Sequence, residues 1–219
     1  MSSEETLTYT LPDLGQISVP LRAESREVLR FLKHTLPRGT QYFERLGHLG
    51  MLREVHKTGH HPRWEHILLQ CFLFNQASQG NRSLSLKTKV TLSDGTEVSS
   101  VEELLKCWVL LLNFGHIHGT FEAERFWMDL FLSDAELKVR LFQGLPTERS
   151  RTLAKDILET ENFYQLHQLF DLFLLSRYKK QGHHRELPID TWILMIEDYM
   201  GDQPDGSTLG RAKDIFHVI

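Results

Sequence analysis

Apolar residues recur every three or four positions through most of the chain, a spacing that is typical of amphipathic helices. Val28, Leu32 and Leu36, for example, would share one face of a helix. Capping-box sequences that begin at Ser100 and Ser133 indicate two further helix starts. The pattern predicts helices over residues 24–36, 41–55, 62–76, 101–113, 122–132, 134–142, 147–161, 163–178 and 189–200.

Two stretches instead alternate apolar and polar residues, as strands with one buried face do. The first covers residues 6–19. The second covers residues 83–92 and leads into Asp94-Gly95, a pair that favours a tight hairpin turn. We therefore expect a mainly α protein that begins with a short N-terminal hairpin or arm over residues 1–22. A single helical domain over 23–219 would follow, with a β-hairpin insertion at 80–99 whose strands lie near 83–98.

Composition limits the classes of function. The formal net charge of −4 is unlike the basic excess of a general nucleic-acid-binding surface, so no such binding is expected. Cys71 and Cys107 lack a Cys-x-x-Cys partner and are expected to be reduced core thiols, which fits a cytoplasmic protein. The longest apolar run, Cys107 to Leu112, is too short to span a bilayer, and no signal peptide is expected at Met1 to Pro12.

Histidine is unusually frequent, with twelve residues in the chain. Seven of them fall into two clusters, one formed by His48, His56, His60, His61 and His66 and the other by His116 and His118. Because imidazole is a common metal ligand, these clusters indicate metal or phosphate chemistry. The spacing of the histidines decides which of these two chemistries is expected.

The first histidine cluster contains a motif. Phe43-Glu-Arg45-Leu46 is followed by Leu52 and then by His61-Pro-Arg63-Trp64-Glu65-His66. This arrangement resembles the dNTP triphosphohydrolase branch of the HD superfamily, whose members carry Phe-x-Arg-Leu on one helix and His-x-Arg-Phe-Glu-His at the start of the next. Trp64 stands where the family usually has Phe, which exchanges one aromatic residue for another.

The resemblance implies an HD-domain-like helical bundle that holds divalent metal ions for phosphate-ester hydrolysis. It maps a metal ligand onto His66. It maps phosphate binding onto Arg63, whose guanidinium can hold a phosphate with two hydrogen bonds, and onto His61. It also implies self-association, because HD proteins often form oligomers.

The other metal ligands of the family are not found. Its His-Asp pair precedes a Gly-His pair, and the nearest stretch in this chain is 110–121. Alignment of the Gly-His pair puts Leu112 and Asn113 on the two ligands, and two other registers also fail to recover both. The last ligand, an aspartate, aligns with Ile193 in the segment 190–198. These degenerate positions remove the carboxylates that a two-metal site needs.

Three hypotheses follow. In the first, the chain is a catalytically degenerate HD-like domain that needs no cofactor. It would act as an interaction, oligomerisation or nucleotide- and phosphate-sensing module, with a protein partner or a second copy of itself. In the second, a rebuilt histidine-rich site binds Zn²⁺, Mn²⁺ or Mg²⁺ and hydrolyses nucleotides. Its ligands would be His66, His61, His116, His118 and Glu122 or Glu65, with His116 and His118 as the catalytic candidates. In the third, it is a helical partner-binding domain unrelated to HD proteins.

Overall fold

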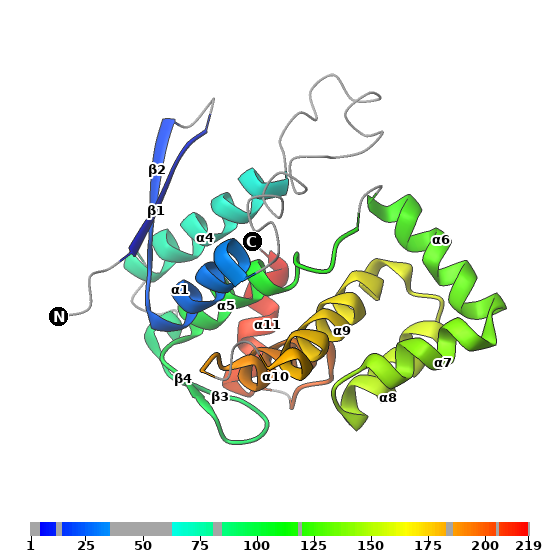
Figure 1. The fold of residues 1–219 in the computed structure, drawn as a ribbon. Coiled ribbons are helices and arrows are strands. Elements are labelled where there is room, and N and C mark those ends of the chain that lie inside the picture. The colour runs from blue at the N-terminus through cyan, green and yellow to red at the C-terminus, as the bar shows by residue number, and fades with distance from the viewer. Residues whose placement is uncertain are drawn as a thin grey trace. The chain divides into compact units, whose positions relative to one another are not determined.

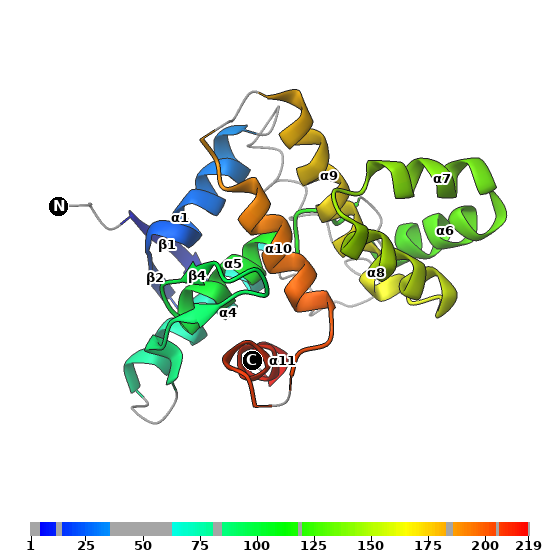
Figure 2. The ribbon, with the colours of Figure 1, turned by 90° about the horizontal axis from the view of Figure 1, so that it is seen from below.

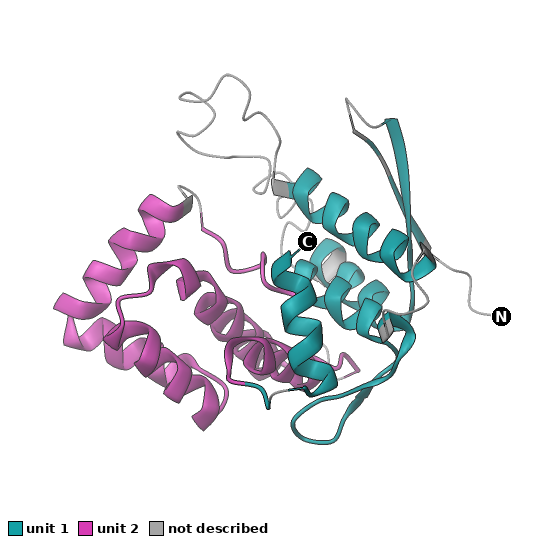
Figure 3. Ribbon diagram, turned by 180° about the vertical axis from the view of Figure 1, so that it is seen from behind, with its two compact units in different colours: residues 1–47, 61–110, 203–219 teal, residues 48–60, 111–202 magenta. Residues whose placement is uncertain are grey.

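The computed structural model describes residues 5–11, 15–35, 63–80, 85–117, 120–182, 186–204 and 206–218. This part of the chain is mainly helical with two two-stranded sheets, which confirms the mainly α prediction (Figure 1). The helix predicted over 41–55 lies outside the described residues. The chain forms two compact units, and Figure 3 colours them separately. Unit 1 comprises residues 1–47, 61–110 and 203–219, and unit 2 comprises 48–60 and 111–202. The single domain over 23–219 stays a prediction.

The N-terminal hairpin of unit 1 is formed as the alternation predicts. Strand β1 (Glu5–Leu11) pairs antiparallel with β2 (Gly15–Leu21), and Leu7 lies opposite Val19. Ile17, Val19 and Leu21 are buried while the residues between them are more exposed, so one face of β2 belongs to the core.

The hairpin insertion is present but shorter than predicted. Strands β3 (Val90–Thr91) and β4 (Glu97–Val98) pair around the expected turn, where Gly95 N donates to Leu92 O. Residues Ser85–Lys87 form a 3₁₀ turn, η2, instead of a strand. A continuous strand would bury Thr88 beside Leu86 and Val90, and the chain turns instead so that Thr88 stays exposed.

The central helix of unit 1 is α5 (Val101–Leu111), all of whose residues are buried. The other helices of the unit are α1 (Ala23–Arg30), which continues into the π-helical turn η1 (Phe31–Thr35), α4 (Arg63–Gly80) and α11 (Thr208–Val218). Ser100 Oγ accepts from Glu103 N at 3.2 Å, which is one of the two hydrogen bonds of a capping box, whereas the Glu103 carboxylate binds Ser25 and Lys106. Phe216 of α11 packs edge-on against Trp108 of α5, with ring centroids 5.8 Å apart, so the C-terminal helix closes the core.

Both cysteines are buried thiols in unit 1, as the sequence predicts. Burial raises the pKa of the Cys71 thiol to about 12 and raises that of Cys107 well above its usual value. Because the thiolate is the reactive form of cysteine, neither side chain is a nucleophile at neutral pH.

Unit 2 is helical. Its elements are α6 (Thr120–Ser133), α7 (Ala135–Gly144), α8 (Glu148–Glu159), the 3₁₀ turn η3 (Phe163–Gln165), α9 (Leu166–Gln181) and α10 (Ile189–Met200). Helices α6, α7 and α8 all contact α9 (Figure 2). The cap of α7 is Asp134, whose carboxylate accepts from the amides of Glu136 and Leu137. The cap predicted at Ser133 is therefore off by one residue, because Ser133 still belongs to α6.

A buried ion cluster fastens α5 to the rest of unit 1. Lys106 is fully buried, and its Nζ donates to Glu102 Oε1 at 2.5 Å, to Glu103 Oε1 at 3.4 Å and to Pro20 O at 2.9 Å. Glu103 Oε2 accepts from Ser25 Oγ at 2.7 Å. The three hydrogens of the ammonium group thus meet three acceptors, which compensates the cost of burying the charge.

Replacing Lys106 by alanine should lower the free energy of unfolding of unit 1 by about 3–5 kcal/mol, because two buried carboxylates lose their cation. Native-state hydrogen exchange of the α5 amides measures this loss. The matched control is Lys89→Ala, which breaks an exposed pair with Glu97 and should leave the free energy of unfolding almost unchanged. Equal costs in the two variants would contradict the prediction.

Candidate metal centre

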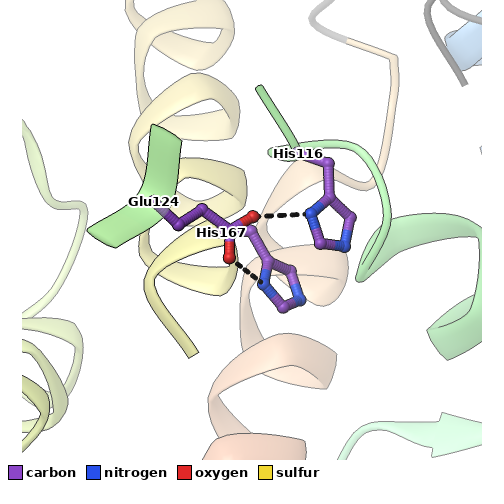
Figure 4. Close-up of side chains that lie close together, drawn as sticks. All are labelled: His116, Glu124 and His167. Atoms are coloured by element: carbon purple, nitrogen blue, oxygen red, sulfur yellow. Dashed lines mark hydrogen bonds and ion pairs between the residues drawn. The ribbon is translucent and has the colours of Figure 1, made fainter. Parts of the chain in front are cut away.

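A buried carboxylate, Glu124, is the centre of the candidate site in unit 2. It lies on α6 with Met128 and Phe131, and helical spacing places all three side chains on the buried face. Burying a carboxylate is unfavourable unless polar partners compensate for the lost water. Two histidines provide those partners, His116 and His167 (Figure 4).

His116 comes from the connection between α5 and α6. The helical turn ends near Phe114, and the next residue, Gly115, donates its amide hydrogen to Asp171 Oδ1 on α9. The following side chain, His116, is buried, and its Nδ1 lies 2.7 Å from Glu124 Oε1, which is a short hydrogen bond.

His167 comes from the first turn of α9. Its Nδ1 lies 3.6 Å from Glu124 Oε2, which is within ion-pair distance but beyond a hydrogen bond. Neither of these two buried atoms has a hydrogen-bond partner within the described ranges. The rings of His116 and His167 stack with centroids 3.8 Å apart and planes inclined by 17°. Glu124 Oε2 and His167 Nδ1 are therefore polar atoms of the cluster that can still bind a ligand such as a metal ion.

The charge of the cluster follows from Glu124. Burial raises the pKa of this carboxyl, but the hydrogen bond from His116 and the interactions with His167 outweigh burial, so that the pKa lies below its usual value. Glu124 is therefore ionised at neutral pH. Since an ionised carboxylate only accepts hydrogen bonds, His116 Nδ1 carries a proton and donates it to Glu124 Oε1.

The cluster has the composition of a metal site. His116, Glu124 and His167 each offer one ligand atom, and these atoms all lie within 4.8 Å of one another. Two imidazole nitrogens and one carboxylate oxygen are a common ligand set for zinc and for other first-row metals. It is less suited to calcium, which takes six to eight oxygen ligands.

The structure places the predicted site residues as follows. His116 belongs to the cluster, whereas the Glu122 side chain is exposed, and Glu124 occupies the buried position two residues later. His66 is exposed on α4 of unit 1, so it and His116 are described in separate units. His61, His118 and the side chain of Arg63 lie outside what the structure describes. The combined site with His66 stays a prediction.

Two further positions at which the HD resemblance expects metal ligands are in the interior of the protein. Leu112 and Ile193 are 4% and 3% exposed, and Asn113 is half-buried. Buried leucine and isoleucine side chains stabilise the fold by packing and cannot coordinate a cation.

Glu124 and His167 are not among the site residues predicted from the sequence. The spacing of Glu124 with Met128 and Phe131 could have identified it, because it marks Glu124 rather than Glu122 as the inward residue. His167 gives no such local signal. It reaches Glu124 only through the packing of α9 against α6.

Comparison with known proteins gives no relative for this chain: no family model matches it, and neither does any curated protein or solved structure. Among the helices of the described residues, none is both long and apolar enough to cross a membrane.

In metal-free protein, the Glu124 carboxyl should titrate below 4.5, the ordinary value for glutamate. The lowered pKa adds stability above the unfolded-state pKa, and this contribution is lost as pH falls through the folded-state pKa. His116→Ala should raise the titration midpoint, because burial remains while the hydrogen bond is lost. Carbon-13 NMR of the carboxyl group measures both. The control is His217→Ala, which replaces an exposed histidine of α11 and should leave the Glu124 titration midpoint unchanged. An unshifted midpoint in H116A would contradict the assignment.

Proposed function

We propose that unit 2 binds a divalent transition-metal ion through His116, Glu124 and His167 and uses it to hydrolyse a phosphate ester. The observation that carries the proposal is the convergence of three ligand atoms within 4.8 Å in a buried position. It is supported by the two atoms on the Glu124–His167 side that have no hydrogen-bond partner in the described chain.

The ligand set fits a zinc-like ion. Glu124 supplies a negative charge because its pKa is lowered, and the two histidines supply neutral nitrogen ligands. With three protein ligands, a coordination position is left for water and substrate, as in catalytic rather than structural zinc sites. A metal held there would supply Lewis-acid chemistry, which lowers the pKa of bound water and polarises a phosphoryl oxygen.

The chain's own residues make this binding dependent on pH. In the metal-free cluster a proton lies on His116 Nδ1, between the imidazole and Glu124 Oε1. A metal ion that takes Nδ1 as a ligand requires that proton to move to Nε2 of the same ring. Metal binding also requires neutral imidazoles and an ionised Glu124, and protons compete for these ligand atoms. Affinity for the metal is therefore expected to fall as pH falls.

The choice of a phosphate ester comes from the HD resemblance. The motif from His61 to His66 is typical of enzymes that act on nucleotides, and its mapped phosphate anchors are Arg63 and His61. Under this proposal the metal is bound by other residues than in HD proteins, and the reaction is still the hydrolysis of a phosphate ester. Nucleotides are then the first substrates to test.

A second candidate function is favoured by the apolar side chains Leu112 and Ile193, which stand where the resemblance expects metal ligands. In this case the chain is a degenerate HD-like domain that senses a phosphate ligand or associates with a partner or with itself. The His116–Glu124–His167 cluster would then only hold the helices of unit 2 together.

Titration of chelator-treated protein with Zn²⁺ in a calorimeter should give about one ion per chain, with an affinity that falls as the pH is lowered. Glu124→Ala and His167→Ala should each weaken binding by at least about tenfold, because each removes one ligand. His66→Ala should bind Zn²⁺ as the wild type does. Absence of binding, together with a melting temperature that EDTA leaves unchanged, would overturn the metal site and favour the second candidate.

Zinc- or manganese-loaded protein should hydrolyse a deoxynucleoside triphosphate or bis(p-nitrophenyl) phosphate. His167→Ala should lower kcat/KM by on the order of 100-fold, since it removes a ligand of the proposed metal. Release of phosphate or nitrophenolate provides the assay, and His66→Ala is the matched histidine variant. A loss of activity in H66A equal to that in H167A would favour the rebuilt site that includes His66.

A further inference from the structure

We propose that Asp171 and Gly115 are positioning residues that set the distance of His116 from His167 and Glu124, an inference that rests on the proposed metal centre. Neither residue is a ligand in this proposal. Both act through the connection between α5 and α6, which carries His116.

The first observation is the hydrogen bond that holds the connection to α9. Asp171 is fully buried, and its Oδ1 accepts from the backbone amide of Gly115. Asp171 lies four residues after His167, so both side chains are on the same face of α9. The helix that presents one histidine therefore also holds the segment that presents the other.

The second observation is the close approach at Gly115. A Cβ atom there would overlap His167 O and would lie 2.5 Å from Asp171 N and 2.8 Å from Asp171 Oδ1. Backbone nitrogen and carbonyl oxygen cannot move away as the end of a flexible side chain can. The backbone at 115 thus lies directly against α9, which only a residue without a side chain permits.

These contacts fix the next residue. Gly115 is held against the backbone of residues 167 and 171. Because His116 is the next residue, its backbone is also held close to α9, the helix that carries His167. The imidazole rings stack with centroids 3.8 Å apart, and His116 Nδ1 reaches Glu124 Oε1 at 2.7 Å. A shift of about 1 Å in the connection would break this short hydrogen bond and separate the ligand atoms.

Unit 2 contains a matched control for a buried acid. Asp198 of α10 is also fully buried, but its carboxylate pairs with Arg149 of α8 at 2.6 Å. Its loss should reduce stability without moving His116. A variant of Asp198 thus separates a general cost of losing a buried carboxylate from a specific effect on the centre.

The test uses Co²⁺ as the probe, because its visible absorption reports the ligands and geometry of the site. Asp171→Ala should weaken Co²⁺ binding by about tenfold or more and change the spectrum, as the loss of an outer-sphere support does. Asp171→Asn keeps an oxygen acceptor for the Gly115 amide and should restore affinity and spectrum. Asp198→Asn should lower the melting temperature and leave Co²⁺ affinity within about twofold of wild type.

A metal-free readout separates failure of this inference from failure of the proposed function. Asp171→Ala should weaken the nuclear Overhauser contact between the His116 and His167 rings, whose centroids lie 3.8 Å apart in the wild type. If the wild type binds no Co²⁺, the metal centre is wrong, and this ring contact still tests the positioning. Wild-type affinity and an unchanged ring contact in folded D171A would overturn the inference.

If the variants do not fold, the inference can still be tested by a measurement on the wild-type protein. The Gly115 amide hydrogen should be strongly protected from exchange, since it donates to a buried carboxylate. Rapid exchange of this amide in the wild type would overturn the inference without any substitution. Gly115→Ala, if folded, should weaken Co²⁺ binding as Asp171→Ala does, and unchanged affinity would count against the close approach.

Discussion

The buried carboxylate of Glu124 is the constraint on which unit 2 depends. An ionised carboxylate that is buried away from water needs hydrogen bonds and positive or polar partners. The connection before α6 and the first turn of α9 supply those partners, so both must lie next to Glu124. His116 meets this requirement with a hydrogen bond, and His167 lies at ion-pair distance. The packing of the unit and its candidate chemistry thus come from the same three side chains.

The Lys106 and Glu124 clusters differ in a way that bears on their roles. Around Lys106 in unit 1, each ammonium hydrogen has an acceptor, and no further ligand is needed. Around Glu124 in unit 2, one carboxylate oxygen and His167 Nδ1 lack a hydrogen-bond partner among the described residues. A closed cluster fits a contribution to stability, whereas an open one fits the binding of a cation.

Local pattern predicted most of the fold, and its errors have identifiable causes. Helical spacing located α5, α6 and α10, and Ser100 accepts from the Glu103 amide at the start of α5 as its sequence predicts. The cap of α7 was placed one residue early, because Ser133 and Asp134 both have capping side chains and only the extent of α6 decides between them. The alternation over 83–92 predicted longer strands than form, because Thr88 interrupts the buried side.

The sequence by itself determined the helical class and the two hairpins and named His116 as a candidate, since each depends on residues close together in the chain. Tertiary structure decided the identity of the site. It chose Glu124 over Glu122 because α6 turns only one face inward, and it brought in His167 through helix packing. Metal ligation needs atoms a few ångströms apart, and for residues on separate helices that distance is set by packing rather than by any pattern along the chain.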